Sequence, residues 1–203
     1  MLNQYNKIAH FYTILSKLVF GDKLHKIQQE LITQLPTEGK LLILGGGNGE
    51  ILPLIYKHAP QLFINYVEAS STMIRLAKKK APDQQKIKFH HMDVLDYSHK
   101  HDQIYSGFFL NLFHEKHIKQ IIKKFEKSNQ TTWYVADFQI NENTKNRLFR
   151  IIQLKLTILF FRLTTQHTIK HLPDICLVFS CSGYSKKNRS SSFVFWEVLK
   201  NNH

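Results

Sequence analysis

Three glycines and one glutamate form the most chemically informative pattern in the sequence. Residues 41–50 read Leu-Leu-Ile-Leu-Gly-Gly-Gly-Asn-Gly-Glu, and Glu68 ends the next apolar run. A strand that ends in glycines can turn without steric cost and lets backbone N–H groups approach a ligand. An acid at the end of the next strand can accept hydrogen bonds from both hydroxyls of a ribose. The pattern therefore predicts a site for a nucleoside-containing cofactor.

The spacing of the glycines narrows the kind of cofactor. A dinucleotide site has the pattern G-x-G-x-x-G, whose third glycine allows close helix packing beside the pyrophosphate. Here Gly45, Gly47 and Gly49 follow G-x-G-x-G, and Glu50 places an anion where a pyrophosphate would lie. The sequence therefore disfavours a dinucleotide. The competing interpretation of Glu68 is a solvated acid after a strand.

Periodicity and turn residues predict helices and strands that alternate along the chain. Such alternation is typical of a parallel sheet covered by helices on both faces. The expected helices are 5–20, 23–35, 51–58, one that Ser70 or Ser71 caps and that stops before Pro82, and 115–125. The expected strands are 41–44, 63–67, 86–91, 103–108 and 132–136.

The last third of the chain departs from this alternation. Residues 143–164 are expected to form a long helix that is apolar on almost every side. Such a helix packs on the sheet, covers a hydrophobic substrate pocket as a lid, or contacts a membrane or partner. Residues 175–181 and 192–199 are expected to be two strands of an antiparallel hairpin. With 203 residues, 43% of them hydrophobic, we expect a single domain over 1–203.

Charge and cysteine content restrict the environment of the protein. The net charge is +13, but only five of the 28 basic residues are Arg, and Lys lacks the planar fork that reads phosphates and bases. Codon bias, an acidic substrate, a membrane surface or RNA can each explain the excess of Lys. The two cysteines, the absence of an apolar signal core and the lack of an 18-residue apolar run together predict a cytoplasmic protein with no transmembrane segment.

Several segments resemble the class I S-adenosylmethionine-dependent methyltransferases. The G-x-G-x-G run resembles their motif I, and residues 5–12 resemble their N-terminal Tyr-Asp-x-Ile-Ala-x-x-Tyr-Asp, with Thr13 in place of the last Asp. Residues 91–94 and 102–113 resemble the motifs of the third and fourth strands. The combination is most similar to a group of small bacterial methyltransferases. It implies a Rossmann-like α/β fold with a seven-stranded, mostly parallel sheet, a C-terminal antiparallel hairpin and an N-terminal helical cap at 1–36.

The resemblance also implies a cofactor, S-adenosyl-L-methionine, and a set of residues that bind it. Asp93 is expected to meet the adenine amino group, unless it only caps a turn. Met73 and Phe108 could instead belong to the core, and Tyr12 could pack on its own helix rather than close over the cofactor. The full expected set is Tyr12, Gly45, Gly46, Gly47, Gly49, Glu68, Ala69, Met73, Asp93, Val94 and Phe108.

Candidates for catalysis lie where strands end, since open α/β sheets bind ligands there. Asn111 could orient the acceptor, His114 could take a proton, and Asp137 could do either. The twelve histidines include no set spaced for a metal, so none is expected. The predicted function is methyl transfer to a small, hydrophobic metabolite. An RNA-directed methyltransferase and a non-catalytic S-adenosylmethionine-binding accessory protein remain alternatives, and the oligomeric state is open.

Overall fold

The computed structural model describes residues 22–127, 131–137, 173–186 and 194–200. The predicted helices at 5–20 and 143–164, and Tyr12 with them, lie outside these ranges. The elements in chain order are α3 (Lys23–Ile32), β1 (Glu38–Leu44), α4 (Leu52–His58), β2 (Gln61–Glu68), α5 (Ser71–Lys80), η1 (Gln84–Lys86), β3 (Ile87–His91), β4 (Gln103–Gly107), η2 (Leu110–Leu112), α6 (Glu115–Phe125), β5 (Thr132–Asp137), α8 (Ile175–Cys181), β6 (Tyr184–Lys186) and β7 (Val194–Lys200).

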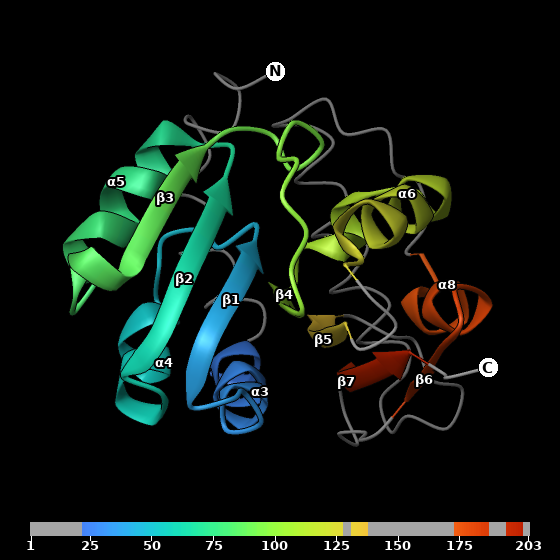
Figure 1. The fold of residues 1–203 in the computed structure, drawn as a ribbon, viewed down its shortest axis with the longest axis horizontal. Helices are drawn as coiled ribbons and strands as arrows, with labels where there is room; N and C mark the ends of the chain where they lie inside the picture. Colours follow the sequence, from blue (N-terminus) through green and yellow to red (C-terminus); the bar gives the residue numbers. More distant parts are fainter. Residues whose placement is uncertain (1–21, 128–130, 138–172, 187–193, 201–203) are drawn as a thin grey trace.

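The strands form one sheet in the order β3-β2-β1-β4-β5-β7-β6 (Figure 1). Strands β1 to β5 pair in parallel, which confirms the parallel sheet predicted from the alternation of strands and helices. The chain runs outward from β1 to β2 and β3, then returns to start β4 on the other side of β1. The carboxyl ends of β1 and β4 therefore flank the point where the strand order reverses, which is where open α/β sheets bind their ligands.

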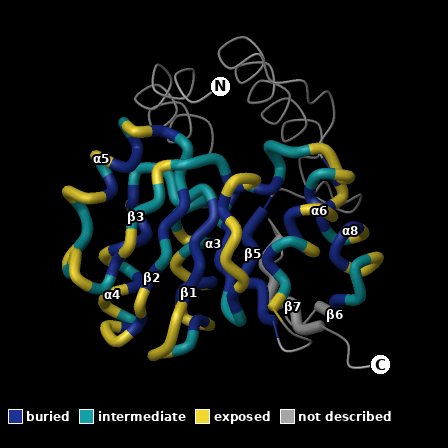
Figure 2. The backbone as a smooth tube through the Cα atoms, turned by 45° about the horizontal axis from the view of Figure 1, so that its top comes forward, coloured by how far each residue is buried: buried dark blue, intermediate teal, exposed yellow. Residues whose placement is uncertain are grey.

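Two hydrophobic cores lie on opposite faces of the sheet, because side chains alternate along each strand. In β1, Leu41 and Ile43 pack in the core shared with α3, α4 and α5, whereas Leu42 and Leu44 pack in the core shared with α6 and α8. Figure 2 shows that many of the buried residues lie in the central strands. The expected cover of helices on both faces is present, and α3 from the predicted N-terminal cap lies on one of these faces.

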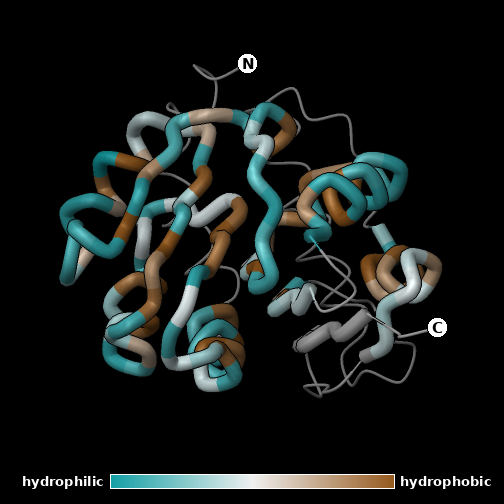
Figure 3. Tube along the Cα trace, viewed as in Figure 1, coloured by the Kyte–Doolittle hydropathy of each residue, from teal (hydrophilic) through white to brown (hydrophobic). Residues whose placement is uncertain are grey.

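Local sequence signals explain where the helices begin. Of the two serines that could cap α5, Ser70 is the cap, because its side chain accepts a hydrogen bond from the Met73 N–H at 3.2 Å. Pro53 lies in the first turn of α4, where its missing N–H leaves no hydrogen bond unmade. Helix α6 buries Ile118, Ile121, Ile122 and Phe125, so it has one apolar face, and Figure 3 shows hydrophilic and hydrophobic residues alternating along it.

The predicted strand at 175–181 is wrong, since these residues form the helix α8. Asp174 caps this helix by accepting a hydrogen bond from the Leu177 N–H at 3.0 Å. Ile175, Val178 and Phe179 are buried at the i, i+3, i+4 spacing of a helix face. The antiparallel hairpin exists, but its first strand is β6, which pairs with β7 and was expected to be part of the connection.

Candidate active site

The loop after β1 has a backbone that only glycine adopts without strain. Gly45, Gly47 and Gly49 have φ angles of 60°, 65° and 76°, in the left-handed region that favours glycine. The loop therefore turns back at the carboxyl end of β1, beside β2 and β4. This is the place that the topology assigns to a ligand.

The four glycines of the loop serve different purposes. A Cβ on Gly45 would lie 2.0 Å from the Phe109 ring, one on Gly46 would lie 2.1 Å from the Tyr66 ring, and one on Gly49 would lie 2.6 Å from the backbone of Ala77. These three glycines let neighbouring elements approach closely. A Cβ on Gly47 would meet no atom of the described residues within 4 Å, so among these residues Gly47 borders open space. Of the four, Gly47 is therefore the one that faces the space a ligand can fill.

Glu68 at the end of β2 holds this loop from the other side. Its Oε2 accepts a hydrogen bond from the Gly47 N–H at 2.9 Å, and its Oε1 accepts one from the Ser70 N–H at 2.8 Å. Burial raises the pKa of the Glu68 carboxyl above its usual value, although backbone N–H groups and His91 act in the opposite direction. A buried carboxylate with a raised pKa is a candidate for a functional site.

The residues present fit a nucleoside with free ribose hydroxyls. The Glu68 carboxylate has about four acceptor sites, and the backbone N–H groups of Gly47, Ser70 and Ala69 occupy three of them, so it keeps capacity for one hydroxyl donor. The open side of Gly47 provides the adjoining space. The structure thus joins Gly47 and Glu68 into one cradle, and cofactor binding by both residues stays a prediction.

The loop after β3 lies beside Glu68. The Met92 N–H donates to the Glu68 carbonyl at 3.2 Å, and the His91 ring lies 3.1 Å from the Ala69 carbonyl oxygen. Asp93 caps the turn that follows, because its Oδ1 accepts a hydrogen bond from the Leu95 N–H at 2.9 Å. Turn capping was the alternative interpretation of Asp93, and adenine contact by Asp93 and the adjacent buried Val94 stays a prediction.

Phe108 follows β4 in an unusual backbone conformation. Its φ of 54° is positive, which for a bulky residue signals strain at a functional or tightly constrained position. Its N–H donates to the Ala136 carbonyl at 2.7 Å, and its side chain is only 6% exposed. Phe108 and the buried Met73 thus belong to the packed interior, as their competing interpretation held, and contact with a cofactor remains a prediction for both.

Two of the three catalytic candidates are bonded to each other. Asn111 donates from its backbone N–H to Asp137 Oδ2 at 3.1 Å and from its Nδ2 to Asp137 Oδ1 at 2.5 Å. Asp137 is 1% exposed. His114 is exposed and precedes α6 as its N-cap residue, with its ring 6.2 Å from that of His117. The structure therefore joins Asn111 and Asp137 and leaves His114 at the surface.

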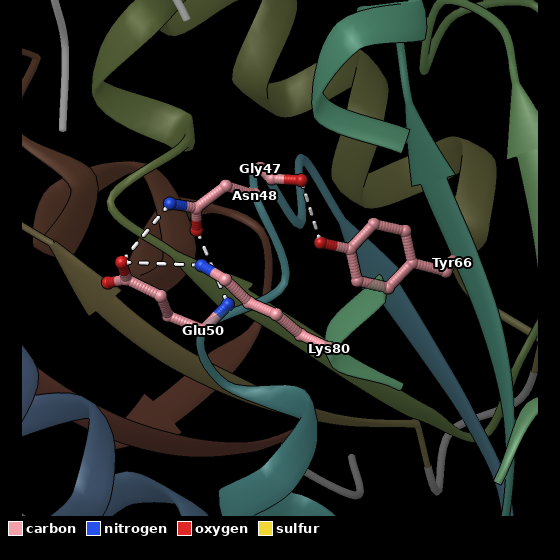
Figure 4. A network of polar contacts seen from close by, with 5 residues as sticks. All are labelled: Gly47, Asn48, Glu50, Tyr66 and Lys80. Carbon is pink, nitrogen blue, oxygen red and sulfur yellow. Dashed lines mark hydrogen bonds and ion pairs between the residues drawn. The ribbon is translucent and has the colours of Figure 1, made fainter. Parts of the chain in front are cut away.

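Tyr66 and Phe109 also shape the loop, and sequence reasoning missed both. The Tyr66 hydroxyl donates to the Gly47 carbonyl at 3.0 Å, and Phe109 packs where Gly45 lacks a Cβ (Figure 4 shows the first contact). Tyr66 precedes Glu68 by two positions, so both side chains lie on one face of β2. That spacing was the only available signal for Tyr66, because its partner lies 19 positions away in the chain.

Within residues 22–127, 131–137, 173–186 and 194–200, no three His, Cys, Asp or Glu side chains are grouped so that they could hold a metal ion. In the same ranges no helix combines the length and the apolar content needed to cross a membrane.

Comparison with known proteins finds one matching domain model and several similar folds. Residues 41–130 match the family model of a methyltransferase domain. An O-methyltransferase family protein from Burkholderia thailandensis is similar in structure, with a TM-score of 0.70 and 17% identity over 97% of this chain and 62% of its own. Mitomycin 7-O-methyltransferase has a TM-score of 0.70 and 12% sequence identity, over 96% of this chain and 60% of its own. A putative S-adenosyl-L-methionine-dependent methyltransferase from Methanococcus maripaludis has a TM-score of 0.62 and 18% sequence identity, over 98% of this chain and 94% of its own.

The chain thus spans about three-fifths of the length of the first two of these proteins. A search of curated protein sequences finds no match. The identities are low, so the structural likeness concerns the fold, and the matched domain covers the glycine loop, Glu68 and the ends of β3 and β4. Residues 41–130 thus match a methyltransferase domain, and the strand order and the Gly47–Glu68 contact lie within an α/β fold that this chain shares with known methyltransferases.

Proposed function

We propose that the protein transfers the methyl group of S-adenosylmethionine to a small, hydrophobic metabolite. The observation that carries the proposal is the Glu68 carboxylate, bonded to the Gly47 N–H and placed beside the open side of that glycine. The similarity to O-methyltransferases supports a small acceptor. The apolar character of residues 143–164 in the sequence supports a hydrophobic one. A cytoplasmic location remains a prediction from the sequence.

Bound S-adenosylmethionine supplies a methyl group that its sulfonium already activates. The protein therefore has to align the acceptor with that methyl group, and alignment lowers a barrier by up to about 7–11 kcal/mol in favourable cases. Gly47 and Glu68 fix the nucleoside end, while the loop of residues 108–113 borders the reacting end. That loop is held by Phe108 on Ala136 and by Asn111 on Asp137.

An alcohol or phenol acceptor also needs a base. The Asn111–Asp137 bonds occupy both oxygens of the Asp137 carboxylate, which suits it to fixing the loop. His114 is exposed and carries an imidazole, the side chain that enzymes use most often for proton transfer. We therefore assign loop positioning to Asn111 and Asp137, and proton removal, where the acceptor requires it, to His114.

The test compares Glu68→Gln with Glu50→Gln. The new amide in Glu68→Gln keeps one acceptor oxygen for the two N–H donors of Gly47 and Ser70, so we expect S-adenosylmethionine to bind about 10- to 150-fold more weakly, the range for a hydrogen bond to a charged group. Glu50 is an exposed acid in the same loop, paired with Lys80 at 3.5 Å, and its variant should bind as the wild type does. Isothermal titration calorimetry measures both. Equal affinity of the wild type and Glu68→Gln would contradict the assigned site.

Turnover separates the proposal from the other two functions. Wild-type protein with a metabolite extract should form S-adenosylhomocysteine, and the signal should survive ribonuclease treatment of the extract. Loss of the signal after ribonuclease would indicate an RNA acceptor. Binding of S-adenosylmethionine without product in any extract that contains the natural acceptor would indicate an accessory protein.

A further inference from the structure

The Tyr66 ring occupies the space that Gly46 leaves open. A Cβ on Gly46 would lie 2.1 Å from Cζ, 2.4 Å from Cε2 and 2.5 Å from the hydroxyl oxygen of Tyr66. Real Cβ atoms do not approach other atoms so closely, so any side chain at position 46 would displace either the loop or the ring. Gly46 and Tyr66 are therefore complementary in shape.

One strand holds both polar groups of Gly47. The Tyr66 hydroxyl donates to the Gly47 carbonyl at 3.0 Å, and Glu68 accepts from the Gly47 N–H at 2.9 Å. Figure 4 shows the phenol of Tyr66 pointing at this carbonyl from β2. The two peptide groups that flank the Gly47 Cα are thereby fixed, while its open side is left for the ligand.

The environment of Tyr66 keeps its proton available for this bond. The side chain is fully buried, and burial together with the nearby Glu68 carboxylate raises the pKa of the phenol well above its usual value. The hydroxyl therefore remains a neutral donor at any pH at which the protein works. A Phe at this position would keep the packing against Gly46 and lose the hydrogen bonds of the hydroxyl, the one to the Gly47 carbonyl and the one with the Gly49 backbone.

We propose that Tyr66 is a positioning residue for the cofactor: together with Gly46 it fixes the backbone of Gly47 in the shape that receives S-adenosylmethionine. The inference rests on the proposed function, because it concerns the same site. When the hydroxyl is lost, the loop samples more conformations, and binding has to restore the one that fits. Cofactor affinity falls as a result, whereas turnover at saturating cofactor stays the same.

The first experiment compares Tyr66→Phe with Tyr184→Phe. Tyr184 is also buried and its hydroxyl also donates a hydrogen bond, to Glu126 at 2.8 Å, but it lies on β6, outside the cofactor site. Both variants remove one buried hydroxyl together with its hydrogen bonds. We expect Tyr66→Phe alone to weaken S-adenosylmethionine binding, by about 2- to 12-fold, the range for one hydrogen bond. The KM for the cofactor should rise by the same factor with kcat unchanged.

Hydrogen exchange in the ligand-free protein gives a reading that does not depend on activity. In Tyr66→Phe the Gly47 amide should exchange faster than in the wild type, while the amides of β1 keep their protection. In Tyr184→Phe the Gly47 amide should exchange as in the wild type. Unchanged Gly47 exchange together with unchanged affinity in Tyr66→Phe would overturn the role of Tyr66. A wild type that fails to bind S-adenosylmethionine would instead overturn the proposed function.

A double-mutant cycle tests the shape complementarity of Gly46 and Tyr66. Gly46→Ala alone should weaken cofactor binding more than about tenfold, since the added Cβ displaces the loop. Leucine lacks the Cε2, Cζ and hydroxyl atoms that the new Cβ would meet, so in Tyr66→Leu the same Gly46→Ala change should weaken binding less than about twofold further. Coupling of this kind is expected for residues in contact. Purely multiplicative losses would overturn the proposal.

Discussion

Asn111 donates two hydrogen bonds to the buried carboxylate of Asp137, one from its backbone N–H at 3.1 Å and one from its side-chain amide at 2.5 Å. The pair connects the loop after β4 to the end of β5, at the edge of the sheet where the methyl acceptor is expected to bind. A buried carboxylate is stable only when its oxygens find donors, and Asn111 supplies two of them. The two residues are bonded as one unit, and their catalytic roles stay predictions.

The charge of this pair can be changed in two opposite directions. Asp137→Asn should lose little folding stability. The side-chain amide of Asn111 can rotate by 180°, so that its oxygen accepts from the new amide at position 137, and the backbone N–H of Asn111 can still donate to the oxygen of that amide. Asn111→Asp should destabilise the protein by about 2 kcal/mol or more at pH 7, since two carboxylates then share the site, and the loss should shrink as pH falls and one of them is protonated. Urea denaturation at pH 7 and pH 5 measures both.

Asp137→Asn also tests the catalytic role of Asp137. A general base contributes about 10²–10⁴-fold to the rate, whereas we expect the turnover of this variant to stay within roughly tenfold of wild type. A thousandfold loss of turnover with the fold intact would instead assign proton removal to Asp137 and remove the case for His114.

The stability of the other variant tests the pair itself. Equal stability of Asn111→Asp and wild type at pH 7 would contradict the bonded pair.

The His101 side chain should make stability depend on pH on the acid side. It is 8% exposed, lies 3.0 Å from the Tyr97 hydroxyl through its Nε2, and has its pKa lowered to about 4, mainly by burial and also by His99, Lys127 and His90, against the opposing charge of Asp102. In the unfolded chain the imidazole titrates near 6.5. Between pH 6.5 and 4 the unfolded state therefore binds the extra proton, and stability falls as pH falls.

The full effect amounts to roughly 3 kcal/mol, at about 1.36 kcal/mol per unit of pKa difference. His101→Gln keeps an acceptor for the Tyr97 hydroxyl and cannot take up a proton, so its unfolding free energy should vary less between pH 7 and pH 4.5. His90, whose pKa burial also lowers, accounts for part of the slope that remains. His114→Gln, at an exposed histidine that is not among the groups acting on His101, is the control. Identical slopes in His101→Gln and wild type would rule out His101 as the origin.

The sequence predicted the parallel part of the fold well because its signals are local. The run 41–44 and the glycines after it, Ser70 as a cap, and the apolar spacing of 115–125 all act within a few residues, and the structure places β1, α5 and α6 accordingly. The sequence could also place Glu68 beside the glycine loop, because the acid ends the strand that follows the loop and neighbouring parallel strands end at the same edge of the sheet. Contacts such as Tyr66 with Gly46 and Asn111 with Asp137 join residues far apart in sequence, so no local pattern reveals them.

The run at 175–181 shows how local signals compete. Ile-Cys-Leu-Val-Phe is rich in residues that favour strands, which led to the wrong prediction of a strand there. The deciding features lie on either side of the run: Asp174 caps the first turn, and Gly183, with a φ of 82°, follows the helix end where a left-handed residue is common. Burial of Phe179 against Trp133, with ring centroids 5.4 Å apart, then stabilises the helix against the sheet.

The Asp174 cap is testable with a control that the chain itself provides. Asp174 and Asp22 both precede helices as N-cap residues, but only Asp174 makes a side-chain capping bond, and α3 begins after Asp22 without one. Asp174→Ala should therefore lower the free energy of unfolding by about 1 kcal/mol, and Asp22→Ala by clearly less. Urea denaturation monitored by circular dichroism measures both. Equal losses in the two variants would mean that the charge at the helix start, rather than the Leu177 hydrogen bond, stabilises α8, because both aspartates place the same charge at a helix N-terminus.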